Sequence, residues 1–164
     1  KLISVPGGTD GPGGVLVCAE NFIYWKNMDH PDVHAAIPRR SDMSEARGLL
    51  LIASAVFKRR DIFFFLIQSE YGDIYKVDLS FKSDTVDGIQ ISYFDTIPPS
   101  VSLSIIRPAF LFSAAESGNH ALFQFIGTGD EEDEDVVMDS DSDFELFRPR
   151  NLKNLEVIEQ LENL

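Results

Sequence analysis

Two histidines, His30 and His34, stand four residues apart, a spacing at which two imidazoles on one face of a helix can bind zinc. Pro31 lies between them, and residues 28–31 have the composition of a turn. No helix is therefore expected to bring the two rings together, and the sequence offers no evident third ligand. His120 follows a turn residue and is expected at the surface. The histidines predict no zinc site.

Residues 6–14 read PGGTDGPGG, a glycine-rich stretch that resembles a phosphate-binding loop. Such a loop ends in Gly-Lys-Ser/Thr, because the lysine and the hydroxyl reach the phosphates and the metal. No lysine follows here, and two prolines lack amide donors, so a surface loop is expected. The chain also has no Gly-x-Ser-x-Gly elbow and no pattern that brings acid, base and nucleophile together. The sequence therefore predicts no catalytic residue, no cofactor and no enzyme.

The acidity of the chain belongs to one segment. Residues 129–145 hold ten acidic residues and no basic one, and without those ten the net charge of −13 falls to −3. Part of this segment, 139–145, resembles a calcium loop but lacks the glycine and the distant glutamate of an EF-hand. Repulsion between like charges predicts a disordered insertion over 129–143. The segment repels nucleic acid from this face of the protein, docks a basic partner, or is a neutral spacer.

Ser140 and Ser142 each have an acidic residue three positions further on, a pattern that casein-kinase-type kinases favour, and both are phosphorylation candidates. Outside the acidic segment the charge balance gives no basic surface for tight nucleic-acid binding. Two small basic clusters are candidates for contact with an acidic partner: Arg39 and Arg40, and Lys58, Arg59 and Arg60.

Short apolar runs rich in β-branched and aromatic residues alternate with turn residues, a pattern typical of strands. The expected strands are 15–19, 22–25, 49–57, 62–68, 74–79, 89–94, 101–106, 110–114 and 121–126. Cys18 lies in the first and is expected to be a buried, reduced thiol. No apolar stretch approaches the roughly 18 residues of a membrane helix. Near the end of the chain, apolar residues at three-residue spacing fit either a short helix from 152 to 161 or a strand through 155–158.

One turn signature occurs twice, 46 positions apart: Glu70, Gly72 and Asp73, then Glu116, Gly118 and Asn119. A weaker echo, Glu20-Asn21, lies 50 residues before Glu70. Self-similarity at about 40 to 50 residues, with several short strands per unit, indicates a β-propeller, with glycine supplying the positive φ of each turn. We therefore predict an all-β partial propeller of about three four-stranded antiparallel blades within a larger protein. Coincident hairpins in a β-sandwich are the alternative.

Longer strings carry a resemblance: VPGGTDGPGGVLVCAEN, FFFLIQSEYGDIYKVDL, YFDTIPPS, FLFSAAESGNHALFQ and FRPRNLKNLEVIEQLENL. Together they resemble the splicing factor 3b subunit 3 family. The wider family includes the DNA-damage-binding protein large subunit and the large subunit of the cleavage and polyadenylation specificity factor. The resemblance weakens in 41–46 and in the acidic segment.

The resemblance implies a nuclear protein of three β-propellers that acts as a scaffold. Residues 1–150 would form the C-terminal blades of the first propeller, and 151–164 would begin the connection into a second. The implied partners are a helical-repeat subunit, a small zinc-finger-like subunit and a very small helical subunit, in the assembly that supports branch-site recognition in pre-mRNA. Contact with the pre-mRNA would be mostly indirect, and neither a membrane nor a small-molecule substrate is implied. The rival functions are an adaptor of a ubiquitin ligase or of the 3′-end cleavage machinery, and an enzyme on a propeller fold, such as a glycosidase.

Overall fold

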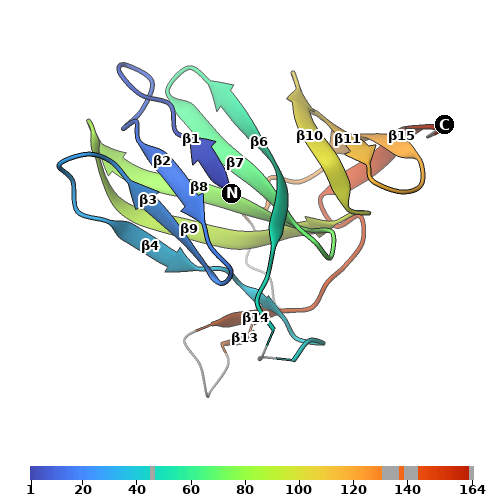
Figure 1. Ribbon diagram of the computed structural model, residues 1–164. Coiled ribbons are helices and arrows are strands. Elements are labelled where there is room, and N and C mark those ends of the chain that lie inside the picture. The colour runs from blue at the N-terminus through green and yellow to red at the C-terminus, as the bar shows by residue number, and fades with distance from the viewer. Residues whose placement is uncertain (45–46, 131–136, 139–143, 163–164) are drawn as a thin grey trace.

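The computed structural model describes residues 1–44, 47–130, 137–138 and 144–162. Every regular element within these ranges is a β-strand (Figure 1). The same ranges contain no helix long and apolar enough to cross a membrane.

Three antiparallel sheets of four strands follow one another along the chain. Blade 1 is formed by β1 (Leu2–Ser4), β2 (Val15–Cys18), β3 (Phe22–Lys26) and β4 (Val33–Ala36). Blade 2 is formed by β6 (Leu51–Arg59), β7 (Ile62–Ser69), β8 (Asp73–Lys82) and β9 (Thr85–Thr96). Blade 3 is formed by β10 (Ser100–Ile106), β11 (Phe110–Ala115), β12 (His120–Phe125) and β15 (Leu155–Leu161). Consecutive blades with meander order confirm the all-β, partial-propeller prediction.

Blade 2 lies between the other two blades and is covered on both faces (Figure 1). One face packs on blade 1, where Trp25 and Phe65 are fully buried, and the other packs on blade 3, where Leu66 and Leu111 are fully buried. A strand buried on both faces needs apolar residues at successive positions, not at alternate ones. This requirement explains the unbroken run FFFLI over 63–67 of β7, whereas Ile62 at the start of the strand is exposed.

The repeated turn signature falls at the same place in each blade, between the second and third strands. Gly72 joins β7 to β8 with φ of 91°, and Gly118 joins β11 to β12 with φ of 86°. Glu20-Asn21 joins β2 to β3, so the weaker echo occupies the corresponding turn of blade 1. The recurrence is therefore a property of the blade, and it does not come from unrelated hairpins of a sandwich.

Between β12 and β15, the described residues 126–130, 137–138 and 144–154 belong to an excursion, and part of this excursion packs against blade 2. There β14 (Glu145–Phe147) pairs in parallel with β5 (Arg39–Arg40) and antiparallel with β13 (Val137–Met138). The Phe147 ring stacks on Tyr93, with 4.2 Å between the ring centroids, and meets Tyr75 edge-on. Most of the predicted insertion 129–143 lies outside the described residues, so its disorder stays a prediction.

After this excursion, β15 pairs with β12 and completes blade 3. Of the two alternatives for the end of the chain, the strand is correct and the helix is wrong, because residues 155–161 supply the fourth strand that β12 requires. The start of a connection into a second propeller at 151–164 stays a prediction.

Candidate interaction sites

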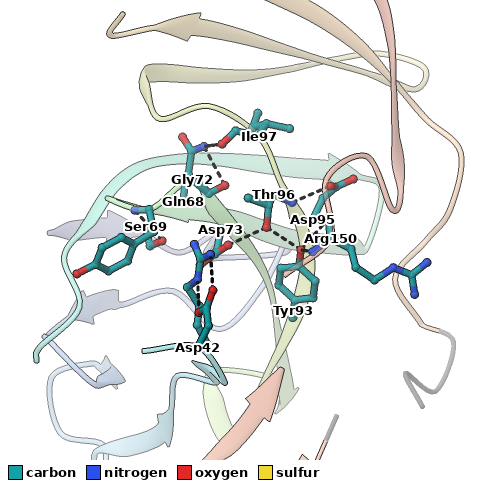
Figure 2. A network of polar contacts seen from close by, with 12 residues as sticks. Asp42, Gln68, Ser69, Gly72, Asp73, Tyr93, Asp95, Thr96, Ile97 and Arg150 are labelled. Carbon is teal, nitrogen blue, oxygen red and sulfur yellow. Dashed lines mark hydrogen bonds and ion pairs between the residues drawn. The ribbon is translucent and has the colours of Figure 1, made fainter. Parts of the chain in front are cut away.

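A buried polar network ties the edge of blade 2 to the excursion and to β5 (Figure 2). The Asp73 carboxylate accepts a hydrogen bond from the Thr96 hydroxyl at 2.7 Å, and the Tyr93 and Thr96 hydroxyls lie 2.7 Å apart. The backbone N–H of Arg150 donates to the Tyr93 hydroxyl at 2.8 Å. Three segments that are distant in sequence are thereby held by one chain of hydrogen bonds.

Arg40 connects this network to β5. Its guanidinium lies 3.4 Å from the buried Asp73 carboxylate and 3.0 Å from Asp42. Burial raises the pKa of Asp73, while hydrogen bonding from Thr96 and the positive charge of Arg40 oppose that rise. The hydrogen bond to Asp42 is the main cause of the raised pKa of Arg40. Arg40 therefore acts as an internal counter-ion for a carboxylate that has no access to water.

Gln68 organises the β9–β10 connection in the same region. Its amide nitrogen lies within hydrogen-bond distance of the carbonyl oxygens of Gly72, Ile97 and Pro98, at 3.1 to 3.3 Å. Its amide oxygen accepts the backbone N–H of Ser100 at 2.9 Å. Gln68 is fully buried, so these bonds replace the water that the polar backbone of the linker would otherwise need.

Asp95 fastens blade 3 to blade 2. Its carboxylate accepts the backbone N–H groups of Asn154 at 2.8 Å and Leu155 at 2.9 Å, immediately at the start of β15. Burial raises the pKa of Asp95, and the backbone donors counteract this effect. The Asn154 amide in turn donates to the Phe94 carbonyl oxygen at 2.6 Å. Asp95 thus positions the strand that completes the third blade.

The predicted partner-contact residues fall into two environments. Arg39 stacks on Phe144, with 3.7 Å from its guanidinium carbon to the ring centroid, and Arg40 serves the network described above. Lys58 forms an ion pair with Asp10, whereas Arg59 and Arg60 are exposed at the tip of the β6–β7 hairpin. Arg59 and Arg60 are thus exposed to water, whereas the β5 pair is half-buried. Partner contact stays a prediction for all five.

The predicted turn residues also differ in their surroundings. Gly72 and Asp73 are buried, and a Glu70 carboxylate oxygen lies 3.4 Å from the backbone N–H of Leu50. By contrast, Glu116, Gly118 and Asn119 are all exposed. The phosphorylation candidates Ser140 and Ser142 lie outside the described residues.

The two spaced histidines have separate neighbours. His30 meets Trp25 edge-on, with 5.7 Å between ring centroids, and His34 lies against Tyr24 at 5.4 Å. Across the ranges that the structure describes, no group of three or more histidine, cysteine or acidic side chains is arranged to hold a metal ion.

A cleft of about 520 Å³ lies between blades 2 and 3. Phe57 and Phe64 stack in its wall with 4.9 Å between their centroids. The Lys76 ammonium lies 5.0 Å above the Phe64 ring and forms an ion pair of 2.6 Å with Asp130, which also lines the cleft. Sequence reasoning placed these phenylalanines in strands but gave no sign that they would share a cleft, because inter-blade packing brings them together.

Consecutive four-stranded meanders packed face to face, joined by a buried network of structural hydrogen bonds, define a β-propeller protein. The chain belongs to the family described as RSE1/DDB1/CPSF1 first beta-propeller, whose profile matches residues 1–162.

Named relatives give the same assignment. The chain is 50% identical over 169 residues to Spliceosome-associated protein 130 A of Arabidopsis thaliana and 42% identical over 167 residues to Splicing factor 3B subunit 3 of Drosophila melanogaster. It is 37% identical over 184 residues to Pre-mRNA-splicing factor RSE1 of Mycosarcoma maydis. These matches cover 98 to 99% of this chain but only 14 to 15% of each relative. The resemblance to the splicing factor 3b subunit 3 family is therefore confirmed.

Proposed function

We propose that this chain supplies blades of the first propeller of a splicing factor 3b subunit 3-type scaffold, which acts in pre-mRNA splicing through protein–protein contacts and not through catalysis. The observation that carries the proposal is the near-complete match of the chain to relatives named as splicing factors. In this proposal the chain works in the nucleus, and 151–164, which include the last strand of blade 3, lead toward a second propeller.

The physical basis of a scaffold role is the rigidity of the blade junctions. Gln68 and Asp95 are fully buried and hydrogen-bond to Ser100 and to the start of β15, so that relative movement of blades 2 and 3 would break several bonds without access to water. A frame of this kind holds its surface loops in fixed positions. A scaffold needs that property more than it needs a reactive pocket.

The proposed partners are a helical-repeat subunit, a small zinc-finger-like subunit and a very small helical subunit of the complex that supports branch-site recognition. Arg59 and Arg60 are exposed on a hairpin tip and are suited to an acidic partner surface. Contact with pre-mRNA would be mostly indirect, since the chain carries a net charge of −13.

A second candidate function is favoured by the breadth of the family. Its description also includes the DDB1 and CPSF1 proteins, so an adaptor of a ubiquitin ligase or of the 3′-end cleavage machinery would share the same blades. Fold alone does not separate these functions, because the partner surfaces and not the blade architecture determine them.

Purification of the full-length protein through an affinity tag at its normal expression level tests the proposal. Mass spectrometry is expected to find splicing factor 3b subunits in stoichiometric amounts. Recovery of ubiquitin-ligase subunits or 3′-end cleavage subunits in their place would refute it. An Arg59→Glu/Arg60→Glu variant, compared with an Asp84→Lys variant at another exposed turn, would test whether the basic hairpin tip contributes to partner recovery.

A further inference from the structure

A small cavity lies where β5, the segment before β6 and the β7–β8 turn meet. Its volume is about 40 Å³, and its wall includes Arg39, Arg40, Arg47, Tyr71 and Tyr75. Three arginine side chains thus line one small space, and among the described residues that line it there is no carboxylate.

Two tyrosine hydroxyls in this wall lack a hydrogen-bond partner within the described part of the chain. The hydroxyl oxygens of Tyr71 and Tyr75 are both buried, and Tyr75 as a whole is only 1% exposed. A buried hydroxyl without a partner costs folding free energy and is rare in native proteins. Two cations also lie near Tyr71, since the Arg40 and Arg47 guanidinium carbons are 5.9 and 5.6 Å from its ring centroid.

The protonation state of Tyr75 keeps its hydroxyl a donor. Burial raises the pKa of Tyr75 well above its ordinary value, and the neighbouring Asp73 adds to this rise. Arginine side chains have only donors, so the wall offers hydrogen-bond donors and positive charge together. The complementary ligand is an oxyanion, which accepts from both kinds of group.

The size of the cavity selects among oxyanions. One water molecule needs about 10–15 Å³ on the same measure, so the cavity holds a group of about three non-hydrogen atoms. A carboxylate has that size, whereas a phosphate group is larger. The apolar side chains of Met43, Leu49 and Leu146 complete the wall and would surround the carbon stem of an acidic side chain.

We propose that this cavity, hereafter the Tyr71–Tyr75 pocket, binds the carboxylate of an aspartate or glutamate side chain presented by a partner protein. The Tyr71 and Tyr75 hydroxyls donate to the carboxylate oxygens, and Arg47 supplies the balancing charge, because Arg40 already pairs with Asp73 and Asp42. The inference is independent of the splicing role, because it depends only on the side chains of the pocket.

Two peptides test the proposal on the full-length protein: acetyl-Gly-Glu-Gly-amide and its neutral counterpart acetyl-Gly-Gln-Gly-amide, followed by ligand-detected NMR. Saturable binding of the glutamate peptide alone is expected. Tyr71→Phe, Tyr75→Phe and Arg47→Gln should each weaken it by about tenfold or more, since each removes a charge-assisted hydrogen bond or a charge. Tyr24→Phe, at a half-buried tyrosine of blade 1, is the matched control and should leave binding unchanged.

The same variants give a readout that a merely structural role would not produce. Without ligand, Tyr75→Phe should leave the protein as stable as the wild type or more stable, because it removes a buried hydroxyl that has no partner. A clear loss of stability would show that the hydroxyl is already satisfied within the protein and would overturn the proposal.

Three further results would overturn it: equal binding of the two peptides, undiminished binding by Tyr75→Phe, and tighter binding of inorganic phosphate than of the glutamate peptide. Glu45, which with Ala46 separates Ser44 from Arg47 in the sequence, is the chain's own candidate carboxylate. If the glutamate peptide binds only after Glu45→Gln, the occupant is internal, and the partner proposal is wrong.

Discussion

Substitution of Gly72 by alanine should destabilise the protein far more than the same substitution at Gly118. The two glycines have nearly the same backbone conformation, with φ of 91° and 86°, and occupy equivalent turns. Both variants therefore incur the cost of a left-handed residue, about 1–2 kcal/mol. A Cβ at Gly118 would have no atom within 4 Å, whereas a Cβ at Gly72 would lie less than 3 Å from the carbonyl oxygen of Ile97.

The clash at Gly72 falls on the network that holds blade 3. Relief would require the β9–β10 linker to move, and the bond from the Ile97 N–H to the Gly72 carbonyl oxygen, 3.1 Å long, would be strained. Overpacking of this kind costs about 1–3 kcal/mol beyond the backbone term. Gly72→Ala should thus cost about 2–5 kcal/mol and Gly118→Ala about 1–2 kcal/mol.

Hydrogen exchange measured by mass spectrometry on the full-length protein can separate the two variants. Amides of β7, β8 and β10 should exchange faster in Gly72→Ala than in Gly118→Ala, by roughly fivefold to a hundredfold. This ratio corresponds to the additional destabilisation of about 1–3 kcal/mol expected for Gly72→Ala. Equal protection in the two variants would refute the claim that the Gly72 turn is packed against the blade 2–blade 3 linker.

Three other predictions concern the ion pair, the buried acid and the acidic segment. Lys76→Met removes the ammonium that contacts Asp130 and the Thr128 carbonyl oxygen, and it should lower the free energy of local opening of 126–130 by about 1–2 kcal/mol. The amides of 126–130 should then exchange hydrogen faster, while those of 110–115 should exchange at an unchanged rate. For Asp95→Asn, burial raises the pKa of Asp95 in the folded state, so the wild type should gain stability over the variant as the pH falls toward about 4, the ordinary pKa of an aspartate. Pulse proteolysis measures this trend, and the opposite trend would show that the backbone donors outweigh burial. Replacement of 131–136 and 139–143 by Gly-Ser sequences of equal length should shift the melting temperature by less than about 2 °C. Extending the replacement to Asp130 and β13 should lower the melting temperature further, because the Lys76–Asp130 ion pair and the β13–β14 pairing are then lost.

Sequence reasoning predicted the blades well because their signals are local. Alternating and continuous apolar runs, turn glycines with positive φ and a repeated spacing are all properties of neighbouring residues. Five short strands, β1, β4, β5, β13 and β14, were not predicted, because each has only two to four residues and only its pairing partner makes it a strand.

The polar network and the Tyr71–Tyr75 pocket were not predictable from the sequence. Asp73 was expected to serve a turn, yet its carboxylate meets Thr96 and Arg40, which lie 23 and 33 residues away. Tyr71 and Tyr75 looked like ordinary strand and turn aromatics, and the arginines that share their pocket come from the segments between blades 1 and 2. Contacts of this kind depend on how blades pack, which no local pattern encodes.

A structure of the full-length protein within its purified assembly is the most direct test of the central claim, that the chain forms consecutive blades of one propeller used as a scaffold. We expect 2–36, 51–96 and 100–161 to be adjacent blades of a single closed ring, with further blades covering the outward faces of blades 1 and 3 and splicing subunits bound to its surface loops. A ring that excludes one of these sheets, or an assembly without splicing subunits, would contradict the account.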